Sequence, residues 1–245
     1  MDKNLALRIL LFFLVVSILA VSVAFFFGEA SLPSLPSYLP TNASPENKIT
    51  VIIDAGHGGE DGGASSAAGL VEKDVNLEIS FYLRDMLRAN GINVIMTRED
   101  DRLLYDRNVD YKGRKKKLDL KARLDVAENT PNAIFVSIHL NSYPQSKYSG
   151  LEVWYSPNNP LSLTLADTIH RNNQAILQPN NKRKAKMASS SIFLLDKATC
   201  PAVLVECGFL TNPAEAELLE SSEYRQQLAF VIFSSIVDYL NNTDQ

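Results

Sequence analysis

Two of the three histidines in this 245-residue chain follow apolar segments that predict buried β-strands. His57 comes after Ile49–Ile53 and stands in a loop with five glycines, and His139 comes directly after Ala133–Ile138. Glycine lets a backbone approach a ligand closely and adopt positive φ. Because ligands of α/β sheets bind outside the carboxyl ends of the strands, both imidazoles are candidates for a metal or substrate site. For either histidine alone, a surface position in a flexible loop is the alternative.

Two glutamates are candidates to complete such a site. Glu206 follows the apolar segment Ala202–Val205, and Glu72 stands between the glycine-rich loop and a predicted helix. Two imidazoles and one carboxylate are a usual ligand set of catalytic zinc, which keeps an open position for water. A further carboxylate is then available as general base. Each glutamate alone could be a solvated surface charge, but an unpaired carboxylate at the end of a buried strand is costly, which favours a role for Glu206.

Four motifs occur in order along the chain: "DAGHGGEDGGA", "EKDVNL", "VSIHLNS" and "PAVLVECGFLTNPAEAELL". Together they resemble the zinc-dependent N-acetylmuramoyl-L-alanine amidases of bacterial cell walls, over nearly the whole chain outside its amino-terminal segment. The resemblance implies that His57, Glu72 and His139 bind Zn²⁺ and that Glu206 is the catalytic acid/base. It also implies that the substrate is peptidoglycan, cut between N-acetylmuramic acid and L-alanine of the stem peptide.

Within the family, the chain resembles the membrane-anchored, germination-specific amidases of the spore cortex. It is short, lacks wall-binding repeats and contains "KRKAKMASSSIFLLDKATCPAVLVE". In that branch the cut is a step toward the muramic lactam of the cortex. Asp196 and Lys197 stand where the commoner family pattern has an arginine. Another zinc peptidoglycan peptidase and a non-enzymatic wall-binding protein are the alternative functions, although a binding protein would be expected to lack one of the four site residues.

The composition of the chain further limits the classes of function that fit it. A net charge of −4 and a pI near 5.5 argue against a nucleic-acid-binding protein. The two cysteines, Cys200 and Cys207, flank one predicted strand that would hold them about 23 Å apart, too far for a disulfide. We expect both to be free thiols, with Cys207 as a less favoured alternative zinc ligand.

The amino-terminal segment predicts a membrane anchor. Residues 9–28 carry no charge and are long enough to cross a bilayer. Lys3 and Arg8 precede them, so the positive-inside rule sends the rest of the chain out of the cytoplasm. A signal peptide cleaved after Ala30, which would release a secreted protein, is the alternative.

The chain is therefore expected to have three parts. Residues 1–28 form a cytoplasmic stub and transmembrane anchor, residues 29–48 a proline-rich tether, and residues 49–245 the zinc amidase domain. The predicted domain alternates strands and helices, and with the resemblance this implies a single α/β domain with a twisted, mostly parallel sheet of about six strands covered by helices.

Local patterns predict the remaining elements. Asp74 is expected to cap a helix that Gly91 ends, and His170 to lie on a solvated helix face. The helices are predicted over Asp74–Asn90, Asp119–Asn129, Leu161–Ala175, from Asn212 onward and over Ser222–Leu240, and the further strands over Ile92–Thr97, Leu151–Tyr155 and Ile192–Leu195.

Two basic clusters, Lys112–Lys117 and Lys182–Lys186, have no assigned role. They are either solvated loops or contacts to anionic wall polymer, peptide carboxylates or a protein partner such as an activator.

Overall fold

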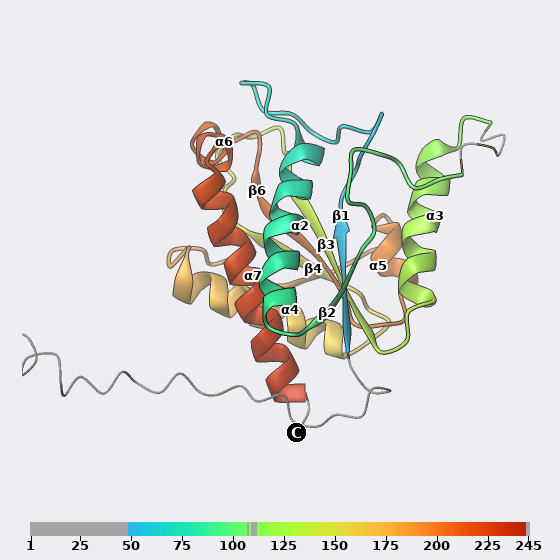
Figure 1. Ribbon diagram of the computed structural model, residues 1–245. Coiled ribbons are helices and arrows are strands. Elements are labelled where there is room, and N and C mark those ends of the chain that lie inside the picture. Colours follow the sequence, from blue (N-terminus) through green and yellow to red (C-terminus); the bar gives the residue numbers. More distant parts are fainter. Residues whose placement is uncertain (1–48, 107, 109–111, 244–245) are drawn as a thin grey trace, which may run out of the picture. The chain divides into compact units, whose positions relative to one another are not determined.

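The computed structural model describes residues 49–106, 108 and 112–243 (Figure 1). The predicted anchor and tether lie outside these residues. Within the described residues, no helix has the length and apolar character needed to cross a bilayer.

One sheet of six strands forms the centre of the described part of the chain, in the order β2-β1-β3-β6-β4-β5. Neighbouring strands run parallel except β4 and β6, which are antiparallel. The predicted mostly parallel six-stranded sheet is thus confirmed. The strands are β1 Thr50–Ala55, β2 Asn93–Met96, β3 Ala133–Asn141, β4 Glu152–Tyr155, β5 Lys186–Met187 and β6 Ala202–Phe209.

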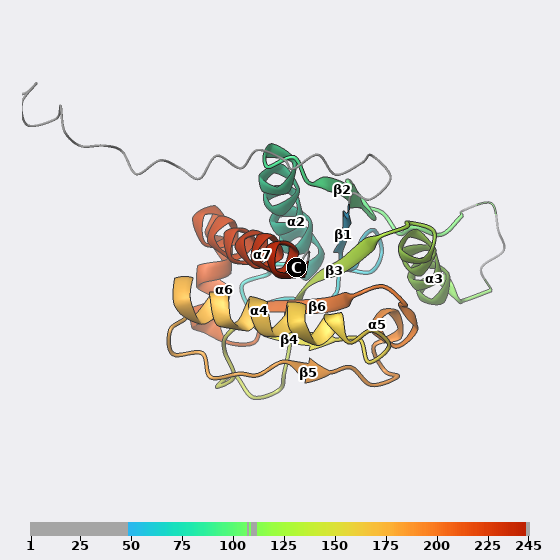
Figure 2. The same cartoon turned by 90° about the horizontal axis from the view of Figure 1, so that it is seen from below.

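Helices cover both faces of this sheet (Figure 2). One face carries α2 (Glu72–Ala89), α4 (Leu161–Ile176) and α7 (Ser222–Thr243), whose apolar side chains form the larger core with β1, β3 and β6. The other carries α3 (Lys115–Glu128) and the short α5 (Phe193–Lys197) over a smaller core. A further helix, α6 (Pro213–Glu220), follows β6 and is capped by Asn212, as predicted.

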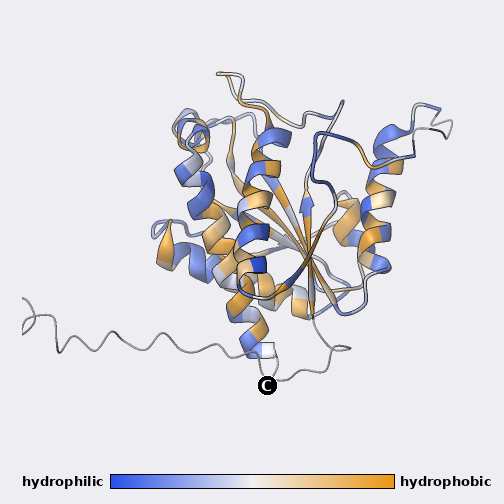
Figure 3. Ribbon diagram, in the orientation of Figure 1, coloured by the Kyte–Doolittle hydropathy of each residue, from blue (hydrophilic) through white to orange (hydrophobic). Residues whose placement is uncertain are grey.

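The apolar stripe predicted for α2 is fully buried. Val75, Ile79, Leu83 and Leu87 recur at helical spacing and are all 0% exposed. Burial of each such side chain contributes about 1.5–3 kcal/mol. The helices carry hydrophobic and hydrophilic residues on different sides (Figure 3).

The two ends of α2 were predicted from single residues, and only the prediction for its carboxyl end is confirmed. The helix ends at Ala89, and Gly91 follows with φ +73 and donates its N–H to the Arg88 carbonyl, so the predicted stop is confirmed. Asp74 does not cap the helix, because α2 begins at Glu72, where Val71 leaves its bridge with Ser65.

The predicted strand Ile192–Leu195 is wrong, because these residues lead into helix α5. A short apolar run is compatible with either structure. Here the antiparallel edge of β6 is already paired with β4, and Leu194 and Leu195 instead pack down on the smaller core.

The prediction that His170 is solvated is also wrong. Its side chain lies on α4 and is only 6% exposed. Glu152 of β4 and Arg183 lie close enough to His170 to affect its charge, so this side of α4 faces the β4 edge of the sheet and not solvent. Burial lowers the pKa of His170, so this imidazole is neutral at physiological pH.

Candidate metal centre

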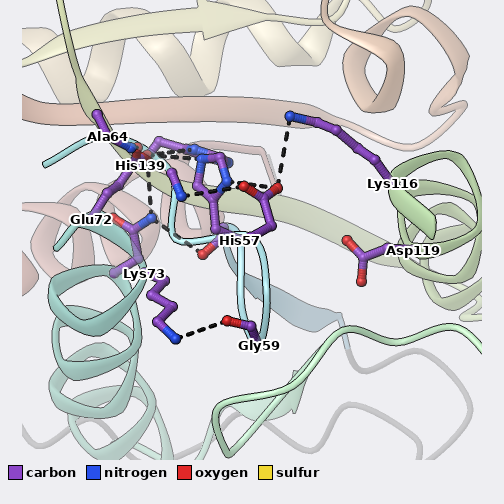
Figure 4. A network of polar contacts seen from close by, with 12 residues as sticks. His57, Gly59, Ala64, Glu72, Lys73, Lys116, Asp119 and His139 are labelled. Atoms are coloured by element: carbon purple, nitrogen blue, oxygen red, sulfur yellow. Dashed lines mark hydrogen bonds and ion pairs between the residues drawn. The ribbon is translucent and has the colours of Figure 1, made fainter. Parts of the chain in front are cut away.

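The structure brings His57, Glu72 and His139 together at the carboxyl ends of β1 and β3 (Figure 4). Glu72 Oε1 lies 3.2 Å from His57 Nε2 and 3.0 Å from His139 Nδ1. One donor atom from each residue lies within 4.8 Å of the others. The three residues predicted as ligands, which come from a loop, a helix and a strand, therefore converge on one point.

Backbone groups hold the Glu72 carboxylate in place. Its Oε2 accepts a hydrogen bond from the Ala64 N–H (2.8 Å), and its Oε1 accepts one from the Leu140 N–H (3.1 Å). Burial alone would raise the pKa of Glu72, but His139 and His57 outweigh it and hold that pKa well below its usual range. Glu72 is therefore an anion aimed between the two imidazoles.

The glycine loop lets His57 and Glu72 approach each other. Gly63 has φ +69, and a Cβ atom there would lie 2.8 Å from His57 Cδ2 and closer still to Glu72 Oε2. On the other side of the His57 ring, Nδ1 lies 3.0 Å from Asp61 Oδ2. Burial lowers the pKa of His57, but Glu72 and Asp61 raise it by more, so its net shift is upward.

These three residues fit a zinc ion. Zinc binds imidazole nitrogen and carboxylate oxygen at about 2.0–2.2 Å, so neighbouring ligands of a tetrahedral site lie roughly 3.3 Å apart. The two observed separations from Glu72, 3.2 and 3.0 Å, are close to this value. With three protein ligands, one coordination position stays open, as in catalytic zinc sites.

Glu206 lies beside these residues and is not one of the three that converge. It pairs in register with His139 of β3, and the antiparallel partner strand places Glu152 directly opposite it. Its Oε2 is buried and has no hydrogen-bond partner among the described residues. Burial, with Glu72 and Glu152 nearby, raises the pKa of Glu206 to about 8. A carboxyl group that exchanges its proton near neutral pH suits general acid/base chemistry.

The sequence did not reveal the role of Glu152. This side chain is buried, and its Oε1 lies 2.9 Å from Arg183 Nη1 and 2.5 Å from Lys186 Nζ. Two members of the second basic cluster thus neutralise a carboxylate opposite Glu206. An acid between the apolar residues Leu151 and Val153 was the signal, because such a carboxylate needs a partner.

The first basic cluster also pairs with acids near the site. Lys115 Nζ lies 2.6 Å from Glu60 Oε2. Lys116, labelled in Figure 4, has its Nζ 3.7 Å from Asp61 Oδ2. Both acids belong to the glycine loop. Within the described residues, both cysteines are free thiols, as predicted. Cys207 packs in the larger core on the opposite face of the sheet from Leu204.

Comparison with known proteins places this chain in a family. The profile of the N-acetylmuramoyl-L-alanine amidases matches residues 51–238. The germination-specific N-acetylmuramoyl-L-alanine amidase of Bacillus subtilis (strain 168) is 37% identical over 83% of this chain and 84% of its own length.

Solved structures agree with the profile. The CwlD amidase from Clostridioides difficile, determined in complex with the GerS lipoprotein, has 38% identity and a TM-score of 0.74 over 78% of this chain and 98% of its own. AmiC2 of Nostoc punctiforme has 32% identity and a TM-score of 0.66 over 79% and 97%. By profile, sequence and fold, the chain belongs to the N-acetylmuramoyl-L-alanine amidase family and is a peptidoglycan amidase.

Proposed function

We propose that the chain cuts the bond between N-acetylmuramic acid and L-alanine with a zinc ion bound by His57, Glu72 and His139, and with Glu206 as general acid/base. The observation that carries the proposal is the convergence of the three donor atoms, with Glu72 Oε1 within 3.2 Å of a nitrogen on each imidazole. The unpaired Oε2 of Glu206 on the next strand is the second support.

Zinc held by these residues would lower the pKa of a coordinated water to about 7 and polarise the substrate carbonyl. Glu206 takes a proton from the attacking water as the water oxygen bonds to the lactyl carbonyl carbon. It then gives that proton to the L-alanine nitrogen as the C–N bond breaks. The products are a lactyl carboxylate and a stem peptide with a free amino group. Burial and the nearby Glu72 and Glu152 raise the pKa of Glu206, so its carboxylate holds a proton more tightly than a solvated glutamate does, which suits a group that takes up a proton and passes it on.

Zinc content and product analysis test this proposal together. The exchanges His57→Ala and His139→Ala should each abolish stoichiometric zinc and the release of intact stem peptides from peptidoglycan. His170→Gln is the matched control, because the third histidine lies on α4 outside the site, and it should keep both properties. Full zinc occupancy in both alanine variants would contradict the ligand assignment. Peptides cut at an internal bond would favour the alternative, a zinc peptidoglycan peptidase.

The biological setting we propose is the spore cortex. The similarity to a germination-specific amidase over most of both chains supports this setting. Deleting the gene in its host should leave spores without muramic lactam, measured by mass spectrometry of digested cortex. A normal lactam content in those spores would contradict the cortex role while leaving the amidase activity untouched.

We further propose that residues 9–28 anchor the enzyme in the cell membrane, with its catalytic domain on the extracytoplasmic side. The uncharged apolar run after Lys3 and Arg8 supports this location. Fractionation of the host should find the full-length chain in the membrane. A soluble extracellular protein whose mature amino terminus is Ser31 would favour the signal-peptide alternative.

A protein partner is part of the same proposal. The CwlD amidase was determined in complex with a lipoprotein, and a membrane-attached lipoprotein would meet an anchored amidase at the same surface. Co-purification of the anchored chain from sporulating cells should recover such a protein, and recovery of the amidase alone under mild detergent would contradict this part of the proposal.

A further inference from the structure

Two buried arginines bind the backbone of the loop that carries His57. Arg123 of α3 and Arg98, which follows β2, are each 1% exposed. Arg123 Nη2 donates to the His57 carbonyl at 2.6 Å, and its Nη1 donates to the Ala55 carbonyl at 2.8 Å. Arg98 donates to the carbonyls of Ala55 and Gly56, both at 2.9 Å. Each carbonyl from residue 55 to residue 57 is therefore bound by a guanidinium group.

Two carboxylates fix the Arg123 side chain. Its Nη1 lies 2.7 Å from Asp54 Oδ1, and its Nε lies 2.8 Å from Asp119 Oδ2. Asp54 also accepts hydrogen bonds from Thr97 Oγ1 (2.7 Å) and Ser137 Oγ (2.6 Å). The network joins β1, the end of β2, β3 and α3, so the guanidinium cannot move without breaking contacts to several elements.

The charges in this network persist despite burial. Burial would raise the pKa of Asp54, but Arg123 and two hydroxyl donors lower it overall. Burial likewise opposes the charge on Arg123, yet Asp54 and Asp119 raise its pKa above the usual value. A buried ion pair often adds little to stability compared with apolar residues of the same volume, so stability alone is a weak account of this arrangement.

The backbone of His57 supplies a better account. His57 has φ +61, a left-handed conformation that is uncommon for residues other than glycine and costs of order 1–3 kcal/mol. The hydrogen bond from Arg123 to its carbonyl fixes the peptide plane that follows His57. In this conformation the imidazole faces Glu72, with His57 Nε2 3.2 Å from Glu72 Oε1.

We propose that Arg123 is a positioning residue, which binds the His57 carbonyl and so holds the imidazole in its metal-binding orientation. The inference rests on the proposed metal centre. It predicts that loss of the hydrogen bond from Arg123 Nη2 to the His57 carbonyl weakens zinc binding by about 10–100-fold, the usual effect of removing a group that orients a metal ligand. A purely structural role would lower the stability of the protein without changing the zinc affinity of its folded form.

The test compares two variants of the full chain. Arg123→Lys keeps a positive charge beside Asp54 and Asp119, but an ammonium group lacks the planar fork that also reaches the His57 carbonyl. Leu228→Ala is the matched control, because Leu228 is fully buried in α7, in the core on the other face of the sheet. The zinc dissociation constant is measured by competition with a chromophoric chelator, below the melting temperature of each protein.

A dissociation constant 10–100-fold higher in Arg123→Lys, with an unchanged value in Leu228→Ala, is the expected result. An unchanged constant in folded Arg123→Lys would overturn the inference. If that variant does not fold, Asp119→Asn takes its place, because it keeps an oxygen for the Leu104 N–H but removes one anchor of Arg123. An unchanged constant there would likewise overturn it. Absence of zinc from the wild-type protein would instead refute the metal centre itself.

Discussion

Replacing Gly56 by alanine is expected to expel zinc by displacing the His139 ring. A Cβ atom on Gly56 would lie 2.8 Å from Cδ2 of His139 and closer still to Cε1 and Nε2 of the same ring. Carbon atoms in contact prefer separations of about 3.5–4.0 Å, so the ring must retreat by roughly 1 Å. Metal sites tolerate deviations of about 0.2 Å in ligand distance. Gly56 does not adopt positive φ, so the effect comes from the ring and not from backbone strain.

The expected loss of zinc affinity in Gly56→Ala is more than about 100-fold, beyond the range for losing a group that only orients a ligand. Overpacking should also cost about 1–3 kcal/mol of folding free energy. Gly62→Ala is the matched control in the same loop, because its Cβ would meet Val71 Cγ1 at an ordinary 3.5 Å. Zinc content after dialysis and chelator competition measure both variants. Stoichiometric, tightly bound zinc in Gly56→Ala would refute the reasoning that the His139 ring cannot yield.

Four other results are expected from the site. Glu206→Gln should keep its zinc and lose turnover by about 10²–10⁴, measured as the rate of stem-peptide release, and loss of zinc or a normal rate would contradict its role. Glu72→Gln should instead lose zinc, because it weakens a ligand, and retained zinc with lost turnover would reverse the two assignments. Because zinc requires a neutral imidazole, zinc affinity should rise as pH increases through the raised pKa of His57. Calorimetry in two buffers should detect the protons that are released on zinc binding. In the metal-free protein, stability should change with pH in the opposite direction. The stability that protonated His57 contributes is complete below about pH 6.5 and is lost as pH rises through its raised pKa. A melting temperature that increases over that pH range would contradict the upward shift of this pKa.

The sequence was informative about the site because each ligand follows or precedes a strongly patterned element. His57 and His139 follow buried strands that pair in parallel, so their carboxyl ends meet at one edge of the sheet. The stripe of α2 fixes which way Glu72 enters the site. These patterns lie in short segments of the sequence. A prediction from such a pattern holds when the tertiary contacts favour the same structure.

The supporting residues could not be predicted because their partners are distant in sequence. Asp54 and Arg123 are 69 positions apart in the sequence. The helical pattern identifies Arg123 only as a polar residue and gives no indication of its partner. The same holds for Glu152, whose partner Arg183 is 31 positions away. The prediction for His170 failed for a related reason, because the β4 edge of the sheet and the segment of Arg183 cover a face of α4 that amphipathicity alone assigns to solvent.

X-ray absorption spectroscopy of the zinc-loaded chain tests the central claim most directly, because it reports the atoms bound to the metal. We expect two imidazole nitrogens at about 2.0–2.1 Å, one carboxylate oxygen at about 2.0–2.2 Å and no sulfur. A sulfur atom at about 2.3 Å, which would point to Cys207, or a single imidazole would contradict the assignment of His57, Glu72 and His139 as the ligands.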